Sequence, residues 1–351
     1  MKQIRKYGWI RILLYPFALA YAGITGLRNY FFDQRIFDIA RFNRPLISIG
    51  NITAGGTGKT PFTLLCLELL KQRYAHMVVV SRGYGRKTKG LIIVSDGQSS
   101  ILSAVEGGDE PVMIAKKFPD IPVIVAEKRA DGIKKAIDQF NPEVILLDDA
   151  FQHRRVERSC DIVLINGSRS LEKEHLLPLG DLRERIKNLK RADIVIINET
   201  HGRLSDKDVS RLNSVFKGPV FSCHFEPFML INSDWQIVGP LQSLQNEQIL
   251  AFTAIADPGQ FQAMLTANGL KINRLLSYPD HFAYDAKSFQ EISAIAKKTG
   301  CTAIITTEKD LVKIDADYFS GFQLLALRLQ GRLENAESFL NKLIHFIDNK
   351  I

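Results

Sequence analysis

A glycine-rich loop between an apolar run and a helical pattern is the feature that most restricts the fold of this 351-residue chain. Residues 45–50 (PLISIG) are typical of a short buried strand, and residues 60–73 carry apolar side chains at helical spacing. Residues 50–60 (GNITAGGTGKT) join the two. Because strand, glycine loop and helix in this order direct backbone N–H groups at phosphate, the sequence predicts a phosphate-binding loop.

Within this loop, Lys59 is expected to reach the β- and γ-phosphates of a nucleotide, and the Thr60 hydroxyl is expected to ligate Mg²⁺. The other candidate nucleotide-binding residues are Thr53, Gly55, Gly56, Thr57 and Gly58. Thr53 departs from the common pattern, which has a glycine there. The alternative is a glycine-rich turn with a chance Gly-Lys-Thr, but the flanking strand and helix favour a variant phosphate-binding loop.

A second apolar run, residues 143–149 (EVILLDD), ends in Asp148 and Asp149. Mg²⁺ prefers carboxylate and water oxygens beside substrate phosphates, so these two aspartates are the candidate metal-side residues. The alternative is a strand end with two solvated aspartates.

The remaining pattern predicts an α/β fold like that of P-loop NTPases, with a mostly parallel sheet and helices on both faces. Further strand-like runs cover residues 76–81, 91–95, 122–126, 161–166 and 193–198. Beyond a polar stretch at 200–218, strands near 248–255, 303–307 and 322–327 predict a smaller C-terminal α/β part. The expected domains are an N-terminal membrane-associated helix (1–35), a P-loop core (36–220) and a C-terminal α/β domain (221–351).

The N-terminus contains a long apolar stretch, residues 9–27, whose uncharged part has 16 residues. As a helix that part would extend about 24 Å, against a hydrocarbon core of about 30 Å. A cleaved signal peptide, a spanning helix and a buried core helix are alternatives. The cations Lys2, Arg5, Lys6 and Arg11 before it favour a helix lying in or partly inserted into a membrane surface. Export is disfavoured because the loop needs a nucleotide, which the cytoplasm supplies.

Composition limits the partners. Lys and Arg number 46 and Asp and Glu 38, a surplus of +8 that suits an acidic ligand, a nucleic acid or an anionic membrane. No nucleic-acid recognition motif accompanies the charge, so no nucleic acid is expected, and no obligate protein partner is evident. The four cysteines are scattered, which disfavours a disulfide framework and a structural zinc site.

Four further positions have a functional and a plain structural interpretation. Asp109 is a candidate general base or a helix N-cap, and Glu110 beside it is a candidate metal ligand or a partner of the helix dipole. Arg183 is a candidate for stabilising phosphoryl charge or part of a solvated helix face. His281 either pairs with a distant carboxylate or lies in an ordinary turn. Residues 307–310 (TEKD) fail the guanine-recognition pattern of GTPases, because the lysine and aspartate are adjacent.

Together these pieces resemble the tetraacyldisaccharide 4′-kinases of lipid A biosynthesis. The matching motifs follow the family's order, and they are 50–61 (GNITAGGTGKTP), 81–86 (SRGYGR), 108–111 (GDEP), 147–154 (LDDAFQHR), 177–184 (LPLGDLRE), 254–258 (AIADP), 279–281 (PDH) and 307–310 (TEKD). The threonine in the phosphate-binding loop is also like the family's.

The resemblance implies transfer of the ATP γ-phosphoryl to the 4′-hydroxyl of an acylated glucosamine disaccharide 1-phosphate, with ATP and Mg²⁺. It implies that Asp109 pairs with His281 to activate the hydroxyl, and that Arg183 and Glu184 assist the phosphates and the metal. Arg185 departs from the family, in which we expect a proline after this glutamate. Family members are peripheral proteins on the cytoplasmic face of the bacterial inner membrane, so a lipid surface is an expected partner.

Two other functions compete with the lipid kinase. A P-loop GTPase or ATPase switch, or a metallochaperone-type NTPase, would hydrolyse nucleotide without a lipid acceptor. A kinase for a soluble metabolite would not need residues 9–27 to touch lipid.

Overall fold

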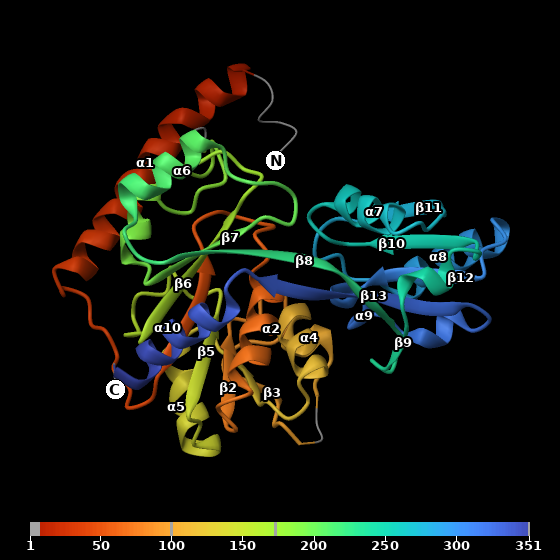
Figure 1. The fold of residues 1–351 in the computed structure, drawn as a ribbon, viewed down its shortest axis with the longest axis horizontal. Helices are drawn as coiled ribbons and strands as arrows, with labels where there is room; N and C mark the ends of the chain where they lie inside the picture. The colour runs from red at the N-terminus through yellow and green to blue at the C-terminus, as the bar shows by residue number, and fades with distance from the viewer. Residues whose placement is uncertain (1–7, 99–100, 172–173, 350–351) are drawn as a thin grey trace. The chain divides into compact units, whose positions relative to one another are not determined.

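The computed structural model describes residues 8–98, 101–171 and 174–349, so Lys2, Arg5 and Lys6 lie outside the described residues. The chain forms two compact units (Figure 1). Unit 1 comprises Met1–Val80, Arg129–His224 and Arg332–Ile351, and unit 2 comprises Ser81–Lys128 and Phe225–Gly331. Residues 81–128, which the sequence analysis assigns to the P-loop core, thus group with the C-terminal part. The three-domain scheme stays a prediction.

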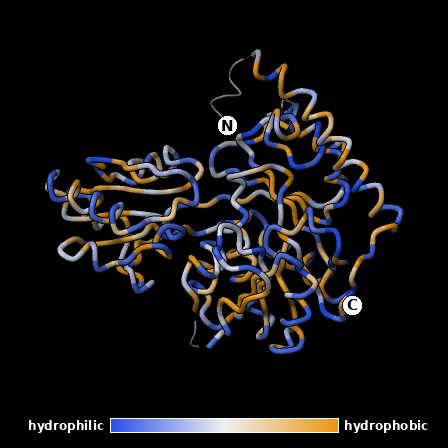
Figure 2. The backbone as a smooth tube through the Cα atoms, turned by 180° about the vertical axis from the view of Figure 1, so that it is seen from behind, coloured by the Kyte–Doolittle hydropathy of each residue, from blue (hydrophilic) through white to orange (hydrophobic). Residues whose placement is uncertain are grey.

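Unit 1 is built on a parallel sheet with the strand order β8–β7–β6–β1–β5–β2. Every residue of β1, β5, β6 and β7 is buried, as expected for strands covered on both faces. The tube is largely orange over this sheet in Figure 2. The strand bounds are β1 Leu46–Asn51, β2 Met77–Ser81, β5 Val144–Asp148, β6 Cys160–Asn166, β7 Ile194–Asn198 and β8 Val220–Ile231, the last continuing into unit 2.

The helices of unit 1 are α1 Gly8–Asp33, α2 Lys59–Leu70, α5 Arg129–Phe140, the 3₁₀ helix η2 Ile186–Arg191, α6 Asp206–Val215 and α10 Ala336–Asn349. Of these, α1 and α2 agree with the helical ranges expected from the sequence. The polar stretch at 200–218 contains α6, whose N-cap Ser205 accepts a hydrogen bond from the Asp208 backbone N–H. The predicted apolar N-terminal helix is confirmed as α1 (red in Figure 1).

Helix α10 returns the end of the chain to unit 1. Its Phe339 is fully buried and meets the rings of Phe62 on α2 and Phe221 on β8, with centroid separations of 5.9 and 5.5 Å. Edge-to-face pairs at this distance are favourable. Cys66 and Cys223 are also buried in this unit, and burial raises the pKa of Cys223 to about 12.

Unit 2 contains the parallel strands β11–β10–β12–β13, paired in that order, and two antiparallel pairs, β3–β4 and the end of β8 with β9. The bounds of its strands are β3 Ile92–Ser95, β4 Val123–Val125, β9 Ile237–Gly239, β10 Ile249–Thr253, β11 Ile272–Ser277, β12 Ala303–Thr307 and β13 Gln323–Leu333. Its helices are α3 Ala104–Gly107, α4 Asp109–Lys117, η3 Leu241–Leu244, α7 Pro258–Ala267, α8 Ala286–Lys298, α9 Glu308–Leu311 and η4 Ala316–Phe319. The predicted α/β class with mostly parallel strands is confirmed, whereas β8, β9 and β11 were not predicted.

The packing of Phe339 on α10 predicts that this residue contributes strongly to the stability of unit 1. Phe339→Ala should lower the free energy of unfolding of unit 1 by about 3–5 kcal/mol, because a buried ring is replaced by a cavity. Denaturant unfolding followed by circular dichroism measures this change. Lys342→Ala, an exposed position on the same helix, is the matched control. Equal stabilities of the two variants would contradict the packing role of α10.

Candidate active site

The phosphate-binding loop lies between β1 and α2 of unit 1. Gly55 and Gly58 have φ of 82° and Gly56 has φ of 34°, a left-handed region that side chains disfavour. A Cβ on Gly55 or Gly56 would meet nothing within 4 Å, so backbone conformation alone requires these two glycines. Gly58 is the N-cap of α2 and provides no side-chain cap. The first N–H groups of α2 thus have no capping side chain and suit a phosphate.

Thr53 fits the loop because this segment is extended. It forms an antiparallel bridge with Leu182, flanked by hydrogen bonds of 2.7 Å from Ala54 N to Asp181 O and from Arg183 N to Ile52 O. A β-branched residue is favourable in such a pairing. The backbone on both sides of Thr53 therefore connects the phosphate-binding loop to the segment that carries Arg183, and a threonine suits this extended position.

Three asparagines at the carboxyl ends of neighbouring strands hold the loop. Asn166 on β6 donates to Gly56 O at 3.1 Å, and Asn198, its register partner on β7, donates to Thr57 O at 3.1 Å. Asn51 on β1 donates to the Thr57 hydroxyl at 2.7 Å. These amides fix the direction of the loop carbonyls. The sequence analysis missed all three, although each ends an apolar strand.

Two cationic side chains of unit 1, Lys59 and Arg183, contact the carboxylate of Asp149. This carboxylate lies 3.5 Å from Lys59 Nζ and accepts hydrogen bonds of 2.9 and 3.1 Å from Arg183. Burial alone would raise the pKa of Asp149, but the charges of Lys59 and Arg183 outweigh it and hold that pKa below its usual range. Asp148 is buried beneath, where Oδ1 accepts a hydrogen bond from Thr63 at 3.1 Å. The two predicted phosphate-side cations thus lie beside Asp149, one of the two predicted acids.

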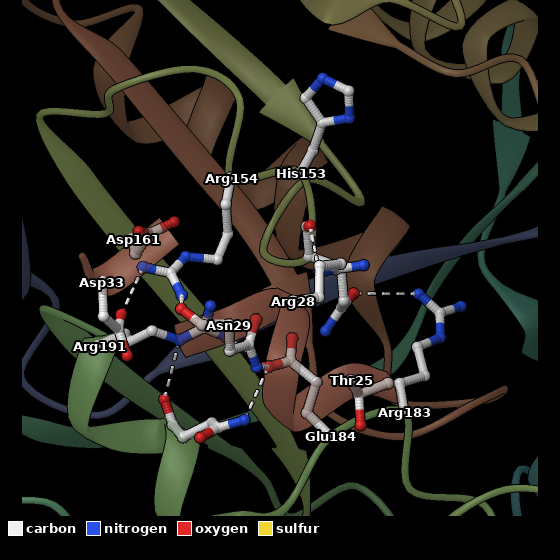
Figure 3. Close-up of polar contacts among 12 residues, drawn as sticks. Thr25, Arg28, Asn29, Asp33, His153, Arg154, Asp161, Arg183, Glu184 and Arg191 are labelled. Atoms are coloured by element: carbon white, nitrogen blue, oxygen red, sulfur yellow. Dashed lines mark hydrogen bonds and ion pairs between the residues drawn. The ribbon is translucent and has the colours of Figure 1, made fainter. Parts of the chain in front are cut away.

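Two predicted metal ligands have other contacts. Glu184 is 1% exposed, and Oε2 accepts hydrogen bonds from Asn29, Asn188 and Arg191 at 2.8–2.9 Å (Figure 3). Its contacts therefore lead to α1 and η2. Glu110 belongs to unit 2, where Oε1 lies 3.9 Å from Lys309 Nζ.

Unit 2 joins Asp109 to His281, which are 172 residues apart in the chain. His281 Nδ1 lies 3.2 Å from Asp109 Oδ2. Asp109 is the first residue of α4, whose N-cap is Gly108 and receives no side-chain cap, so the N-cap interpretation of Asp109 is wrong. His281 has a φ of 61°, a strained backbone conformation of the kind found at functional sites.

Two lysines that the sequence analysis did not select complete this cluster. Lys309 Nζ lies 3.1 Å from His281 Nε2, and Lys313 Nζ lies 3.6 Å from Asp109 Oδ2. An ammonium group only donates, so Nε2 accepts from Lys309 and the imidazole proton is on Nδ1, directed at Asp109. Burial would raise the pKa of Asp109, but the hydrogen bond from His281 and the nearby lysine charges lower it below its usual range.

Asp310 explains why the TEKD motif does not recognise a base. It is fully buried and accepts hydrogen bonds from Thr253, Thr307 and the Ala254 backbone N–H. Its carboxylate therefore organises the interior of unit 2, and the neighbouring Lys309 is the member of the motif that reaches the Asp109–His281 pair. The sequence analysis placed Thr307 and Lys309 in an imperfect GTPase pattern and in a motif of the family resemblance, without a role for either residue.

Three comparisons with known proteins agree. The family model described as "LpxK: Tetraacyldisaccharide-1-P 4'-kinase" matches residues 10–348. Tetraacyldisaccharide 4'-kinases of Syntrophus aciditrophicus and Aquifex aeolicus are 40% and 35% identical to this chain over 339 residues, covering 93% and 96% of it and 91% and 99% of the relatives. A crystal structure of LpxK from Aquifex aeolicus in complex with ATP matches with a TM-score of 0.79 and 32% identity, covering 96% of this chain and 99% of that one.

The asparagine contacts predict an effect on nucleotide affinity. Asn198→Ala should weaken ATP binding by about tenfold, because the buried Thr57 carbonyl loses its donor and the loop loosens. Isothermal titration calorimetry measures the affinity. Asn213→Ala, at an exposed position on α6, should bind ATP like the wild type. A folded Asn198→Ala variant with unchanged affinity would show that the loop does not depend on this amide.

Proposed function

This chain belongs to the tetraacyldisaccharide-1-P 4'-kinase family, and from that membership we propose how its residues perform the reaction. It is a kinase that transfers the γ-phosphoryl of ATP, with Mg²⁺, to the 4′-hydroxyl of a tetraacylated glucosamine disaccharide 1-phosphate in lipid A biosynthesis. Family membership decides for this reaction over an NTPase switch and over a kinase for a soluble metabolite.

We propose that the loop from Thr53 to Thr60 binds the ATP phosphates. The left-handed glycines aim N–H groups at the phosphates, and the start of α2 contributes the positive end of its dipole. Lys59 then exchanges its contact with Asp149 for the β- and γ-phosphate oxygens. Positioning and charge neutralisation of this kind supply most of the catalysis in phosphoryl transfer.

The donors around Thr60 fit Mg²⁺. Thr60 begins the buried face of α2, and Asp148 and Asp149 end β5 in the same unit. Among the described residues no group of three His, Cys, Asp or Glu side chains could hold a metal without other ligands. This suits Mg²⁺, which binds through one or two carboxylates, waters and substrate phosphates. When bound, the ion neutralises phosphate oxygens as they gain charge.

Arg183 is proposed to stabilise the phosphoryl group during transfer. Its guanidinium lies beside Asp149, within 2.9 Å, and Asp149 also contacts Lys59. A planar guanidinium presents several donors in a fixed geometry that matches phosphate oxygens. Glu184, whose carboxylate has partners on α1 and η2, is not needed as a metal ligand in this scheme.

The hydrogen bond between Asp109 and His281 is the observation that supports our proposal for how the 4′-hydroxyl is activated. The proton on Nδ1 of His281 holds Asp109 Oδ2, so Oδ1 is proposed to accept the proton of the 4′-hydroxyl. The hydroxyl oxygen forms its bond to the γ-phosphorus while the bond to the β–γ bridging oxygen breaks and ADP leaves. A carboxylate is a weak base for an alcohol, but a loose transition state releases the proton late.

We propose that the outer face of α1 contacts lipid. Among the described residues, Ile10–Asp33 is the helix long and apolar enough to cross a membrane, and 11% of its most apolar window is buried. Ile12, Leu13, Phe17, Ile24 and Leu27 are 55–75% exposed, and hydrophobic stretches of α1 appear orange near the N-terminus in Figure 2. An exposed apolar face with flanking arginines suits a membrane interface. The cytoplasmic face of the bacterial inner membrane, where ATP is present, is the proposed location.

A kinase assay tests the acceptor site. In detergent micelles, labelled ATP should phosphorylate the tetraacylated disaccharide 1-phosphate, and Lys59→Ala should abolish the transfer. Asp109→Ala and His281→Ala should each lower kcat by about 10²–10⁴ because the hydroxyl loses its base or the base loses its orientation. Calorimetry should find ATP binding retained. Both variants turning over like wild type would exclude the pair from catalysis.

A vesicle flotation assay tests the lipid-facing helix. The triple variant Leu13→Ser, Phe17→Ser, Ile24→Ser should bind anionic vesicles at least about 100-fold more weakly, because three apolar side chains no longer enter the bilayer surface. Ile237→Ser with Val238→Ser, at exposed apolar positions of β9, is the control and should float like wild type. Undiminished flotation of the triple variant would contradict the proposal.

A further inference from the structure

The face of α1 that packs on the rest of unit 1 mixes small apolar side chains with polar ones. A surface helix of a globular protein buries its apolar stripe, but α1 exposes most of its large apolar side chains. Its inward positions repeat at helical spacing, and they are Ala18, Tyr21, Ala22, Thr25, Arg28, Asn29 and Phe32. Apolar burial alone therefore does not account for how this helix is held.

Two of these side chains bind the segment that carries Arg183, and Figure 3 shows the contact of Asn29 with Glu184. Tyr21 donates its hydroxyl to the Arg183 carbonyl oxygen at 2.9 Å, and Asn29 donates to Glu184 Oε2 at 2.8 Å. Burial, followed by the charge of Glu184, raises the pKa of Tyr21, so its hydroxyl stays protonated and remains a donor. Two consecutive residues of one loop are thus fixed by one helix face.

Glu184 is held from both sides. Arg191 on η2 donates to the same Oε2 at 2.8 Å, and the Arg191 guanidinium lies 4.4 Å from the centroid of the Phe151 ring. A buried carboxylate with three donors has one favoured position. Because this anchor precedes η2 and follows Arg183 directly, the backbone of Arg183 has little freedom.

The same helix also binds the segment that follows Asp149. Arg28 donates to the Gln152 carbonyl oxygen at 2.8 Å, and Arg154 donates to the Asn29 carbonyl oxygen at 3.0 Å. The Gln152 side chain in turn donates to Asn51 O at 2.7 Å, next to the phosphate-binding loop. Both charged partners at the phosphate site, Asp149 and Arg183, therefore belong to segments bound by α1.

We propose that α1 positions Arg183 for phosphoryl transfer, with Tyr21, Asn29 and Glu184 as positioning residues that hold its backbone while its guanidinium faces the phosphate site. The inference rests on the proposed role of Arg183 in transfer. The helix then has two separable tasks: its outer face binds lipid, and its inner face sets the rate. In this role Glu184 acts through the backbone of Arg183.

A double-mutant cycle tests this inference with the full-length chain in detergent micelles. Asn29→Leu keeps the number and branching of the side-chain heavy atoms but removes the donor, and it should lower kcat about tenfold while KM for ATP changes less than twofold, because small displacements of a catalytic group reduce rate more than ground-state binding. Arg183→Ala should lower kcat more. In the Arg183→Ala background, Asn29→Leu should cost no further rate, because the residue through which it acts is gone.

Tyr21→Phe provides a second cycle that retains the buried ring, and it should lower kcat about threefold to fivefold in the same non-additive way. Asp33→Asn, on the same helix, removes the charge from an ion pair with Arg154 that does not involve the Arg183 segment, and it should have wild-type kcat. Flotation of all variants should equal that of wild type, since the outer face is unchanged.

Three results would overturn the positioning role. One is an equal loss of rate from Asn29→Leu with and without Arg183. Another is unchanged kcat in both Asn29→Leu and Tyr21→Phe. The third is a loss of flotation that accounts for the loss of rate. Absence of lipid phosphorylation by the wild type would instead contradict the kinase function itself, so the two failures are distinguishable.

Discussion

The contact of Lys59 and Arg183 with one carboxylate, Asp149, is the interaction around which unit 1 is arranged. Two cations intended for phosphates would repel each other and the positive end of α2 if nothing lay between them. Asp149 resolves this conflict and keeps both side chains near the place where phosphates bind. The elements that support it are the strand β5, the bridge between Thr53 and Leu182, and the helix α1 through the Arg183 backbone. When ATP binds, its phosphates replace the Asp149 carboxylate as the partner of Lys59 and Arg183. Because both cations are already in place, little rearrangement accompanies binding.

Much of the fold could be predicted because the central strands are continuous apolar runs with clear ends. β1, β5, β6 and β7 are entirely buried, so periodicity and length identify them. β8 was missed for the opposite reason: its sequence VFSCHFEPFMLI mixes polar residues and a proline, and its burial changes along its length. The grouping of residues 81–128 with 225–331 was also out of reach, because it depends on contacts between distant segments, which no local pattern encodes.

The site divides in the same way. The phosphate-binding loop and the acids at the end of β5 are short contiguous motifs. The spacing and chemistry of their residues were therefore enough to predict Lys59, Thr60 and Asp149. The Asp109–His281 pair links residues 172 apart, and only the family resemblance connected them. Lys309 and the asparagines that end β6 and β7 were missed because their roles depend on contacts with residues distant in the sequence. The metal-side role of Glu184 stays a prediction from the resemblance, and its contacts with Asn29 and Arg191, which no local pattern encodes, carry the separate proposal that it positions Arg183.

The order of segments in unit 1 also bears on how the chain matures on the ribosome. The strands of unit 1 come from residues before and after the first segment of unit 2, 81–128. Phe339 of α10, which follows the second segment, packs against Phe62 and Phe221. Translation delivers α1 first and α10 last, so the helix that we propose to contact lipid emerges long before the nucleotide-binding unit can close. A nascent chain held at the bilayer by that helix would still have an unfinished nucleotide site, and it would acquire activity at the surface that holds its substrate.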